Sequence, residues 1–352
     1  MRVILAMSGG VDSSAAALLL KRQGYDVIGI TFKNFDNNLL FNESTKGSCC
    51  SLEQINRARN NCQALGIPHY VLNRVDEFKR HVLDDFAFSY RSGITPNPCI
   101  RCNALVRWPE LIALADKMNA DFVATGHYAR ILRYEGKACP AKAVYGEKDQ
   151  SYALWQVKAR FLERTIFPLG GYRKSDIRTL AMQNNLIAGD YKESQDICFA
   201  PDGDYLRLVG ESVPGEICGL DGTVLGRHKG LEHFTIGQRR GLGIASVQPL
   251  YVVDIDRRRN RVIVGKEADL FRKNMTIDSA NWFVDDRIGR TFDCRAKIRY
   301  KHEPADCTVK ITGAGTAAVE FAAPQRAITP GQSAVFYDGD AVLGGGIIAK
   351  EK

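Results

Sequence analysis

The sequence lacks any apolar run that approaches the roughly 20 residues needed to span a bilayer. It also contains no internal repeat, no low-complexity segment and no basic tail, although its formal net charge is +8. Arg2 and the apolar residues after it resemble the start of a signal peptide, but Gly9 and Gly10 interrupt the apolar core that such a peptide requires. We therefore expect a cytoplasmic protein that does not contact a membrane, and the positive charge favours a polyanionic partner.

Disulfide and zinc frameworks are missing as well. Ten cysteines among 352 residues are too few and too unevenly spaced for a secreted disulfide scaffold. A zinc finger would need a second Cys-x-x-Cys pair, or a matching histidine pair, beside Cys99-Ile100-Arg101-Cys102, and the chain has neither. In a reducing compartment most of the thiols are expected to be small buried side chains. No chemical pattern surrounds Cys139, Cys218, Cys294 and Cys307.

The most informative stretch is Ser8-Gly9-Gly10-Val11-Asp12-Ser13-Ser14, which joins a short apolar run to an alanine- and leucine-rich segment. The pattern predicts a strand, a glycine turn and a helix, and the unpaired N–H groups at a helix N-terminus favour phosphate. The Gly-Lys-Ser/Thr ending of a Walker loop is absent, which disfavours a kinase or GTPase. The hydroxyls of Ser8, Ser13 and Ser14 can add donors, and Asp12 can hold a nucleotide-bound Mg²⁺. The alternative is a tight turn without a ligand.

Strands and helices alternate through residues 1–203, which predicts an α/β fold with a doubly wound parallel sheet. Ligands of such sheets bind at the carboxyl ends of the strands, where the phosphate loop, Phe32 and Gly126 fall. Helical periodicity nearly disappears further on, and short strands separated by turns follow. We therefore expect a small mixed linker domain over 204–270 and a C-terminal β-barrel over 271–352.

Two further segments hold candidate reactive cysteines. The prolines and asparagine of Thr95-Pro96-Asn97-Pro98 predict a rigid loop, and the helix predicted from Ala104 would place its N-terminus beside Cys102. A helix N-terminus and the adjacent Arg101 both favour a thiolate at Cys102. A Cys-x-x-Cys pair can also bind zinc, carry an iron–sulfur cluster or cycle as a disulfide. Cys198 lies between two apolar residues, where a buried, unreactive cysteine is the common outcome.

The motifs together resemble the tRNA-specific 2-thiouridylases, the MnmA/TrmU family of N-type ATP pyrophosphatases that carry a PP-loop. The matching segments occur in the family's order and cover nearly the whole chain: Ala6 to Ser14, Thr95 to Pro98 with Cys102 and Asn103, Thr125 to Ala129, Lys148 to Tyr152, Ser194 to Phe199, Phe234 to Leu242 and Lys297 to Tyr300. The resemblance implies ATP-dependent transfer of sulfur to the 2-position of the wobble uridine in tRNA. It also implies a sulfur donor, such as a cysteine desulfurase or a relay protein.

The resemblance further implies roles for single residues. The implied ATP-binding residues are Ala6, Met7, Ser8, Gly9, Gly10, Val11, Asp12, Ser13, Phe32 and Gly126. Cys102 would be the nucleophile and Cys198 the carrier of a persulfide, and the two would form a disulfide that a reductant resets. The implied tRNA contacts are Asn97, Pro98 and Cys99 at the target base, and Lys148, Asp149, Gln150, Arg299 and Tyr300 elsewhere.

One position departs from the family, because Cys99 stands where many members have aspartate. With Cys102 and Cys198 it could supply three thiolates to a [4Fe–4S] cluster. Cys49-Cys50 is expected to be incidental rather than a sulfur relay, and a monomer is the default. Two other functions stay open: an enzyme that adenylates a small molecule or a different tRNA base, and an RNA-binding protein with a vestigial nucleotide fold.

Overall fold

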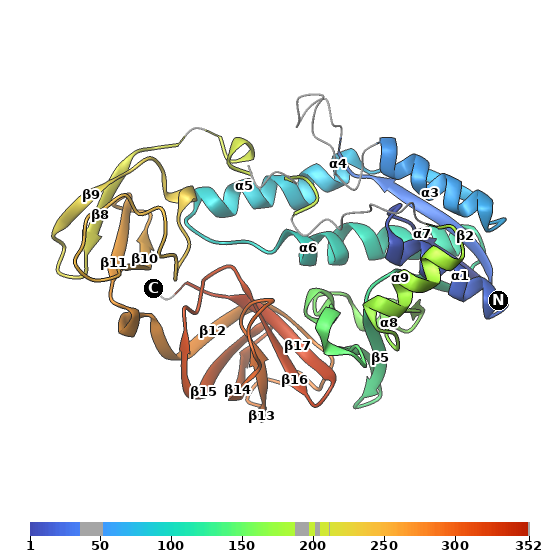
Figure 1. The fold of residues 1–352 in the computed structure, drawn as a ribbon. Coiled ribbons are helices and arrows are strands. Elements are labelled where there is room, and N and C mark those ends of the chain that lie inside the picture. The colour runs from blue at the N-terminus through green and yellow to red at the C-terminus, as the bar shows by residue number, and fades with distance from the viewer. Residues whose placement is uncertain (36–51, 187–196, 201–204, 211, 351–352) are drawn as a thin grey trace. The chain divides into compact units, whose positions relative to one another are not determined.

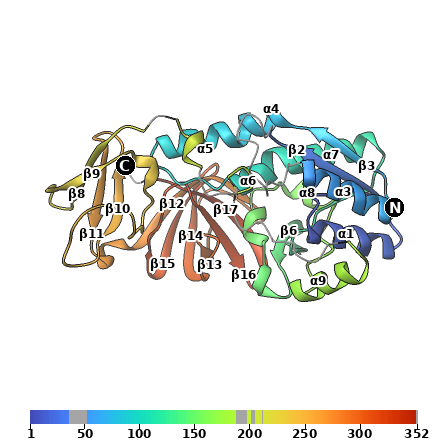
Figure 2. The same cartoon turned by 45° about the horizontal axis from the view of Figure 1, so that its top comes forward.

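The computed structural model describes residues 1–35, 52–186, 197–200, 205–210 and 212–350. The chain forms two compact units, shown as ribbons in Figure 1 and Figure 2. The first comprises residues 1–82, 98–205 and 339–343, and the second comprises 83–97, 206–338 and 344–352. Over the part of the chain that the structure describes, no helix is both long and apolar enough to cross a membrane.

A parallel sheet is the centre of the first unit. Its described strands lie in the order β3-β2-β1-β4-β7, and every neighbouring pair is parallel. The strands are β1 (Arg2–Ala6), β2 (Asp26–Lys33), β3 (His69–Asn73), β4 (Phe122–Ala124) and β7 (Thr165–Ile166). The helices include α1 (Val11–Arg22), α3 (Leu52–Ala64), α4 (Val75–Phe78), α7 (Trp108–Lys117), α8 (Ala159–Leu162) and α9 (Lys174–Gln183). The predicted doubly wound parallel sheet is confirmed.

Helices cover both faces of this sheet because alternate strand residues point to opposite sides. Val3 and Leu5 of β1 pack in a buried cluster with side chains of α1, α3 and α9. Ile4, between them, packs with Leu111 and Ala115 of α7. The carboxyl ends of β1, β2 and β4 consequently lie at one edge of the sheet, where a doubly wound fold binds its ligands.

The helix predicted from Ala104 begins six residues earlier. It starts with α6 (Pro98–Arg101), continues as a π-helical stretch (Cys102–Arg107) and runs on as α7. Proline is favoured in the first turn because the N–H that it lacks would have no partner there. The prediction that a helix N-terminus lies beside Cys102 is therefore wrong: Cys99 occupies the first turn, and Cys102 lies one turn further on.

A hairpin in the first unit was not predicted. Strands β5 (Ala129–Tyr134) and β6 (Lys137–Lys142) pair antiparallel. The residues between them, Glu135 and Gly136, both have positive φ, at 47° and 79°. Two consecutive positive φ angles are the mark of a tight hairpin turn whose twist matches that of the strands.

The second unit is mainly β-structure. Four of its described strands form a sheet in the order β10-β11-β8-β9: β8 (Gly215–Gly219), β9 (Val224–His228), β10 (Tyr251–Asp256) and β11 (Arg261–Gly265). The order β12-β15-β14-β13-β16-β17 closes on itself, since β12 pairs with both β15 and β17. These strands are β12 (Phe271–Trp282), β13 (Thr291–Lys297), β14 (Ala305–Gly313), β15 (Thr316–Arg326), β16 (Ser333–Asp338) and β17 (Ala341–Ile348). The predicted C-terminal β-barrel is confirmed. Helix α5 (Asp84–Arg91) also belongs to this unit.

Two cysteines of the barrel that showed no pattern in the sequence face each other. Cys294 on β13 is directly opposite Cys307 on β14, and their sulfur atoms lie 3.6 Å apart. The contact with Cys307, and burial second, raise the pKa of the Cys294 thiol. Strand register brought them together, and spacing along the chain does not reveal register.

Candidate active site

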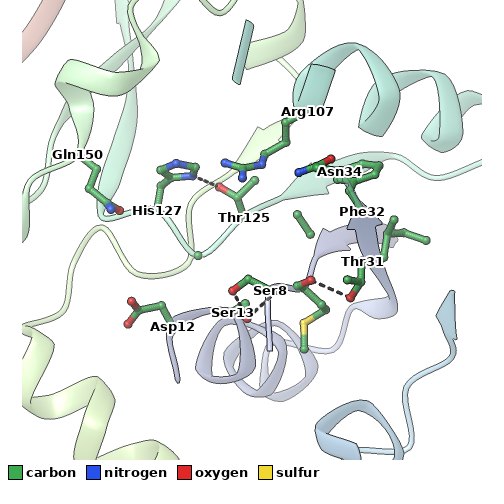
Figure 3. A pocket seen from close by; sticks show the side chains of 14 residues that line it. Ser8, Asp12, Ser13, Thr31, Phe32, Asn34, Arg107, Thr125, His127 and Gln150 are labelled. Carbon is green, nitrogen blue, oxygen red and sulfur yellow. Dashed lines mark hydrogen bonds between the residues drawn. The ribbon is translucent and has the colours of Figure 1, made fainter. Parts of the chain in front are cut away.

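A pocket of about 190 Å³ opens at the carboxyl ends of β1, β2 and β4 (Figure 3). Seven of the residues predicted to bind ATP line it: Ala6, Met7, Ser8, Asp12, Ser13, Phe32 and Gly126. The remaining lining residues are Ile30, Thr31, Asn34, Arg107, Thr125, His127 and Gln150. Gly9, Gly10 and Val11, which were also predicted to bind ATP, are not among the lining residues.

The glycine loop takes a conformation that other residues would not allow. Gly9 has a φ of 74°, and a Cβ atom there would lie 2.2 Å from the backbone oxygen of Gln54. The carbonyl of Gly10 accepts hydrogen bonds from Ser13 Oγ at 3.1 Å and Ser14 Oγ at 3.0 Å. Because Ser14 is fully buried and bonded within the loop, it holds the loop together, and the expectation that its hydroxyl serves as a phosphate donor is wrong.

Gly126 allows the loop after β4 to approach the first turn of α1. A Cβ atom on Gly126 would lie 2.9 Å from Ser13 N and 3.0 Å from the carbonyl carbon of Asp12. Those atoms belong to the backbone and have little freedom to move. The helix N-terminus therefore points its N–H groups into a narrow pocket, a geometry suited to phosphate.

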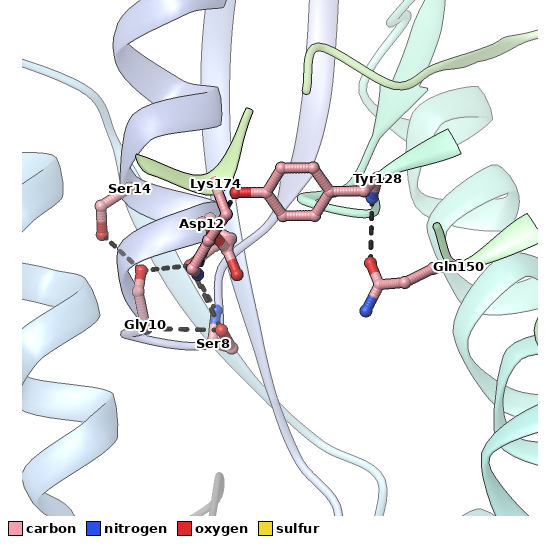
Figure 4. Close-up of polar contacts among 8 residues, drawn as sticks. Ser8, Gly10, Asp12, Ser14, Tyr128, Gln150 and Lys174 are labelled. Atoms are coloured by element: carbon pink, nitrogen blue, oxygen red, sulfur yellow. Dashed lines mark hydrogen bonds and ion pairs between the residues drawn. The ribbon is translucent and has the colours of Figure 1, made fainter. Parts of the chain in front are cut away.

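Asp12 is held by two side chains that sequence reasoning missed (Figure 4). Lys174 Nζ donates to Asp12 Oδ1 at 2.6 Å, and the hydroxyl of Tyr128 donates to the same oxygen at 2.8 Å. The Asp12 side chain is 35% exposed, and it is a hard oxygen ligand of the kind that Mg²⁺ prefers. The site thus fits a Mg²⁺ ion that accompanies a nucleotide. No sequence signal links Asp12 to Lys174, which is 162 residues away.

His127 is a neutral group in the wall of the pocket. Its Nδ1 lies 2.7 Å from Thr125 Oγ1, and its ring contacts those of Trp108 and Phe167. Burial among these groups, and then the charge of Arg107, lower the pKa of His127 to about 3. A neutral imidazole can accept or donate a hydrogen bond at physiological pH without adding charge.

The two predicted catalytic cysteines differ in exposure. Cys102 is 7% exposed, whereas Cys198 is partly exposed. Their segments contact the same helical stretch: Phe199 packs on Phe78 with ring centroids 5.9 Å apart, and Arg101 Nε donates to the backbone oxygen of His81 at 3.1 Å.

The iron–sulfur hypothesis is not supported. Within the described ranges, no group of three or more histidine, cysteine or acidic side chains could hold a metal ion, although Cys99, Cys102 and Cys198 are all described. Cys99 is exposed and Cys102 is buried one helical turn away. Cys49-Cys50 and Ser194 to Asp196, the first residues of the matched segment that contains Cys198, lie outside the described residues.

The residues predicted to contact tRNA fall into two groups. Lys148, Cys99 and Tyr300, which is 47% exposed, reach solvent. Of the others, four side chains make hydrogen bonds within the protein, and Pro98 is buried. The Asp149 carboxylate accepts hydrogen bonds from Ala143 N, Ser151 N and Ser151 Oγ, and Gln150 Oε1 accepts one from Tyr128 N. Arg299 donates a hydrogen bond to the backbone oxygen of Arg326, and Asn97 Oδ1 accepts one from Ser333 N. Pro98 is buried in α6.

Three family models match the chain in succession. They are described as a tRNA methyl transferase HUP domain over residues 1–202, a tRNA methyl transferase PRC-barrel domain over 203–266 and an aminomethyltransferase beta-barrel domain over 272–348. The chain is also weakly similar to a solved structure, a predicted subunit of tRNA methyltransferase from Methanocaldococcus jannaschii. The TM-score is 0.33 at 23% sequence identity, over 52% of this chain and 74% of that chain.

Curated relatives match over the full length. A tRNA-specific 2-thiouridylase MnmA of Clostridium perfringens is 44% identical over 99% of this chain and 98% of its own. Another, of Geobacter metallireducens, is 44% identical over 99% and 96%. A protein of Rubrobacter xylanophilus named bifunctional protein NifU/MnmA is 47% identical over 99% of this chain and 70% of its own length.

Proposed function

The chain belongs to the tRNA-specific 2-thiouridylase family, and we propose from this that it transfers sulfur to the 2-position of the wobble uridine in tRNA, using ATP. The observation that carries the proposal is 44% identity to relatives of that name over 99% of the chain. The glycine loop at the N-terminus of α1 supplies the matching chemistry, because it lines a pocket suited to the phosphates of a nucleotide. The protein is accordingly a tRNA-uridine 2-sulfurtransferase.

ATP first activates the uridine. The C2 carbonyl of uracil is a poor electrophile, and adenylation of its oxygen makes that oxygen part of a good leaving group, AMP. The N–H groups of the α1 N-terminus hold the phosphates that leave as pyrophosphate. Asp12 would hold a Mg²⁺ ion, and that ion would supply neutralisation of the phosphate charge.

Sulfur transfer follows through the two cysteines. The terminal sulfur of a Cys198 persulfide attacks C2 and displaces AMP, which takes the original oxygen with it. The thiolate of Cys102 then attacks the Cys198 sulfur, and the thiouridine leaves with the transferred sulfur. A Cys102–Cys198 disulfide forms, and a dithiol reductant resets it. Phe199, next to Cys198, packs on Phe78, and Arg101, next to Cys102, donates a hydrogen bond to His81. These contacts with one helical stretch support the action of the two cysteines as a pair.

Solvent exposure decides which of the proposed tRNA residues are assigned a direct contact and which a supporting role. Lys148 and Tyr300 are exposed and suit a phosphate and a base, respectively. Asn97, Pro98 and Cys99, at the start of the helix that bears Cys102, are proposed to meet the target base. Asp149 and Gln150 would act by holding the segment behind Lys148, and Arg299 by holding the segment of Tyr300. Unstacking the uridine costs less in a loop than in a duplex.

We further propose three domains: ATP-binding over 1–203, a linker over 204–270 and a tRNA-contacting barrel over 271–352. The three successive family-model matches support these boundaries. A monomer acting in the cytoplasm, with a cysteine desulfurase or a relay protein as sulfur donor, completes the proposal.

The descriptions of two matching models name a methyl transferase. Methyl transfer needs neither a phosphate loop nor a pair of cysteines, so these features favour thiolation. An enzyme that adenylates a small molecule is the other alternative.

The release of pyrophosphate from ATP, measured with and without tRNA, separates these functions. A thiouridylase should release pyrophosphate only when tRNA is present. Release that is indifferent to tRNA would instead indicate a small-molecule substrate, and the absence of release under both conditions would contradict adenylation altogether.

A further inference from the structure

Arg107 is a cation in the pocket that none of the roles above uses. It lies in the π-helical stretch that also holds Cys102, and it lines the pocket together with Thr125 and His127. In Figure 3 it lies across the pocket from Ser8, Ser13 and Asp12. An arginine so placed either supports the wall or binds part of the nucleotide.

The contacts of Arg107 leave its guanidinium available. Among the described residues, Arg107 donates from NH1 to the neutral Oδ1 of Asn103 at 2.7 Å, and no carboxylate there pairs with it. Asn103 is 2% exposed and is itself fixed, because its Nδ2 donates to the oxygen of Ala153 at 3.0 Å. A guanidinium carries five N–H donors, and that of Arg107 lines the pocket.

Arg107 acts electrostatically on the wall of the nucleotide pocket. Its charge lowers the pKa of His127, second to burial.

The position of the reacting phosphorus follows from these two sides. Under the proposed function, the leaving pyrophosphate would lie at the N-terminus of α1, and the uracil oxygen would arrive from the side of Cys102. The α-phosphoryl group would then lie between them, and Arg107 comes from the same helical stretch as Cys102. We infer that Arg107 is a catalytic residue that donates hydrogen bonds to the non-bridging oxygens of the α-phosphate of ATP.

The chemistry needs such a cation. The bond from the uracil oxygen to the α-phosphorus forms as the bond to the pyrophosphate oxygen breaks, the electron pair leaves with pyrophosphate, and the N3 proton of uracil goes to solvent. The non-bridging oxygens carry charge throughout, and a preorganised guanidinium stabilises it. Asn103 is a positioning residue, since it fixes the direction of Arg107.

Equilibrium binding to the full-length chain tests this inference with three probes: AMP, adenosine and inorganic pyrophosphate. Arg107→Gln should raise the Kd for AMP by about 10- to 100-fold, the usual loss for a charge-assisted hydrogen bond. The Kd values for adenosine and pyrophosphate should stay within about threefold of the wild type, because these two probes lack the α-phosphate. Arg107→Lys, which keeps the charge, should fall between, and Arg160→Gln, an exposed arginine outside the pocket, should change nothing.

Two results would overturn the assignment. Equal weakening of AMP and adenosine would mean that Arg107 only supports the wall, and weakening of pyrophosphate would place it at the β- and γ-phosphates. Pyrophosphate release by Arg107→Ala, with tRNA present, should recover in part when guanidinium ion is added, and no recovery would also count against the role. The inference rests on the proposed function, but the binding test contains no tRNA. A chain that failed to thiolate tRNA could therefore still show the selective loss of AMP.

Discussion

Gly126→Ala is the sharpest structural test of the pocket, because the three atoms nearest to the added methyl group all belong to the backbone. Its Cβ would lie 2.9 Å from Ser13 N, 3.0 Å from Asp12 C and 3.2 Å from Asp12 O. Overpacking of this kind costs about 1–3 kcal/mol. The strain is relieved when the loop after β4 moves away from α1, which opens the pocket. At 1.4 kcal/mol per tenfold, the Kd for ATP should rise roughly 5- to 150-fold.

Isothermal titration of ATP into the variant measures this change. Gly146→Ala is the matched control, since a Cβ there meets no atom within 4 Å and its φ is not in the left-handed region. The control should bind ATP like the wild type, and Gly126→Ala alone should also melt at a lower temperature. A Kd for ATP within about twofold of the wild type in Gly126→Ala would refute the placement of the nucleotide between Gly126 and α1.

Three other changes test separate parts of the site. Asp12→Ala removes the proposed Mg²⁺ ligand and should slow tRNA-dependent pyrophosphate release by about 100-fold or more, whereas a loss below about fivefold would exclude that role. Cys198→Ser should still release pyrophosphate but not thiolate tRNA, and thiolation at the normal rate would disprove the persulfide assignment. His127 is protonated near pH 6.5 in the unfolded chain and only near pH 3 in the folded chain. The free energy of unfolding should therefore decrease as the pH is lowered through this window, by up to roughly 1.4 kcal/mol per pH unit. Melting temperatures from pH 7 to 5 should fall less steeply in His127→Gln, and an identical slope would contradict a histidine that stays neutral in the folded chain.

Local patterns in the sequence were enough to predict the sheet and the phosphate loop. The apolar run of β1, the two glycines and the alanine-rich α1 are contiguous, and each is determined by its own residues. The start of the helix at Pro98 was missed because the two prolines suggested a loop, although proline suits a first helical turn. The signal for the β5–β6 hairpin was also present, in Glu135-Gly136, but glutamate before the glycine is a weaker turn signal than the usual asparagine or aspartate.

The parts of the site that the sequence could not reveal depend on contacts between distant segments. Lys174 and Tyr128 reach Asp12 from 162 and 116 residues away, and no spacing rule connects them. Arg107 is a helix residue whose direction into the pocket depends on Asn103 and, through it, on Ala153. The burial of Ser14 likewise follows from packing, since its hydroxyl also accepts a hydrogen bond from Asn61 on α3.

Mass spectrometry of tRNA nucleosides tests the central claim most directly. The protein is incubated with tRNA, ATP, Mg²⁺ and a persulfide donor, and the wild type is compared with Cys102→Ser. The proposed function predicts that the wobble uridine gains one sulfur in place of oxygen with the wild type and does not gain it with the variant. Release of pyrophosphate by the wild type without any gain of sulfur on tRNA would contradict it.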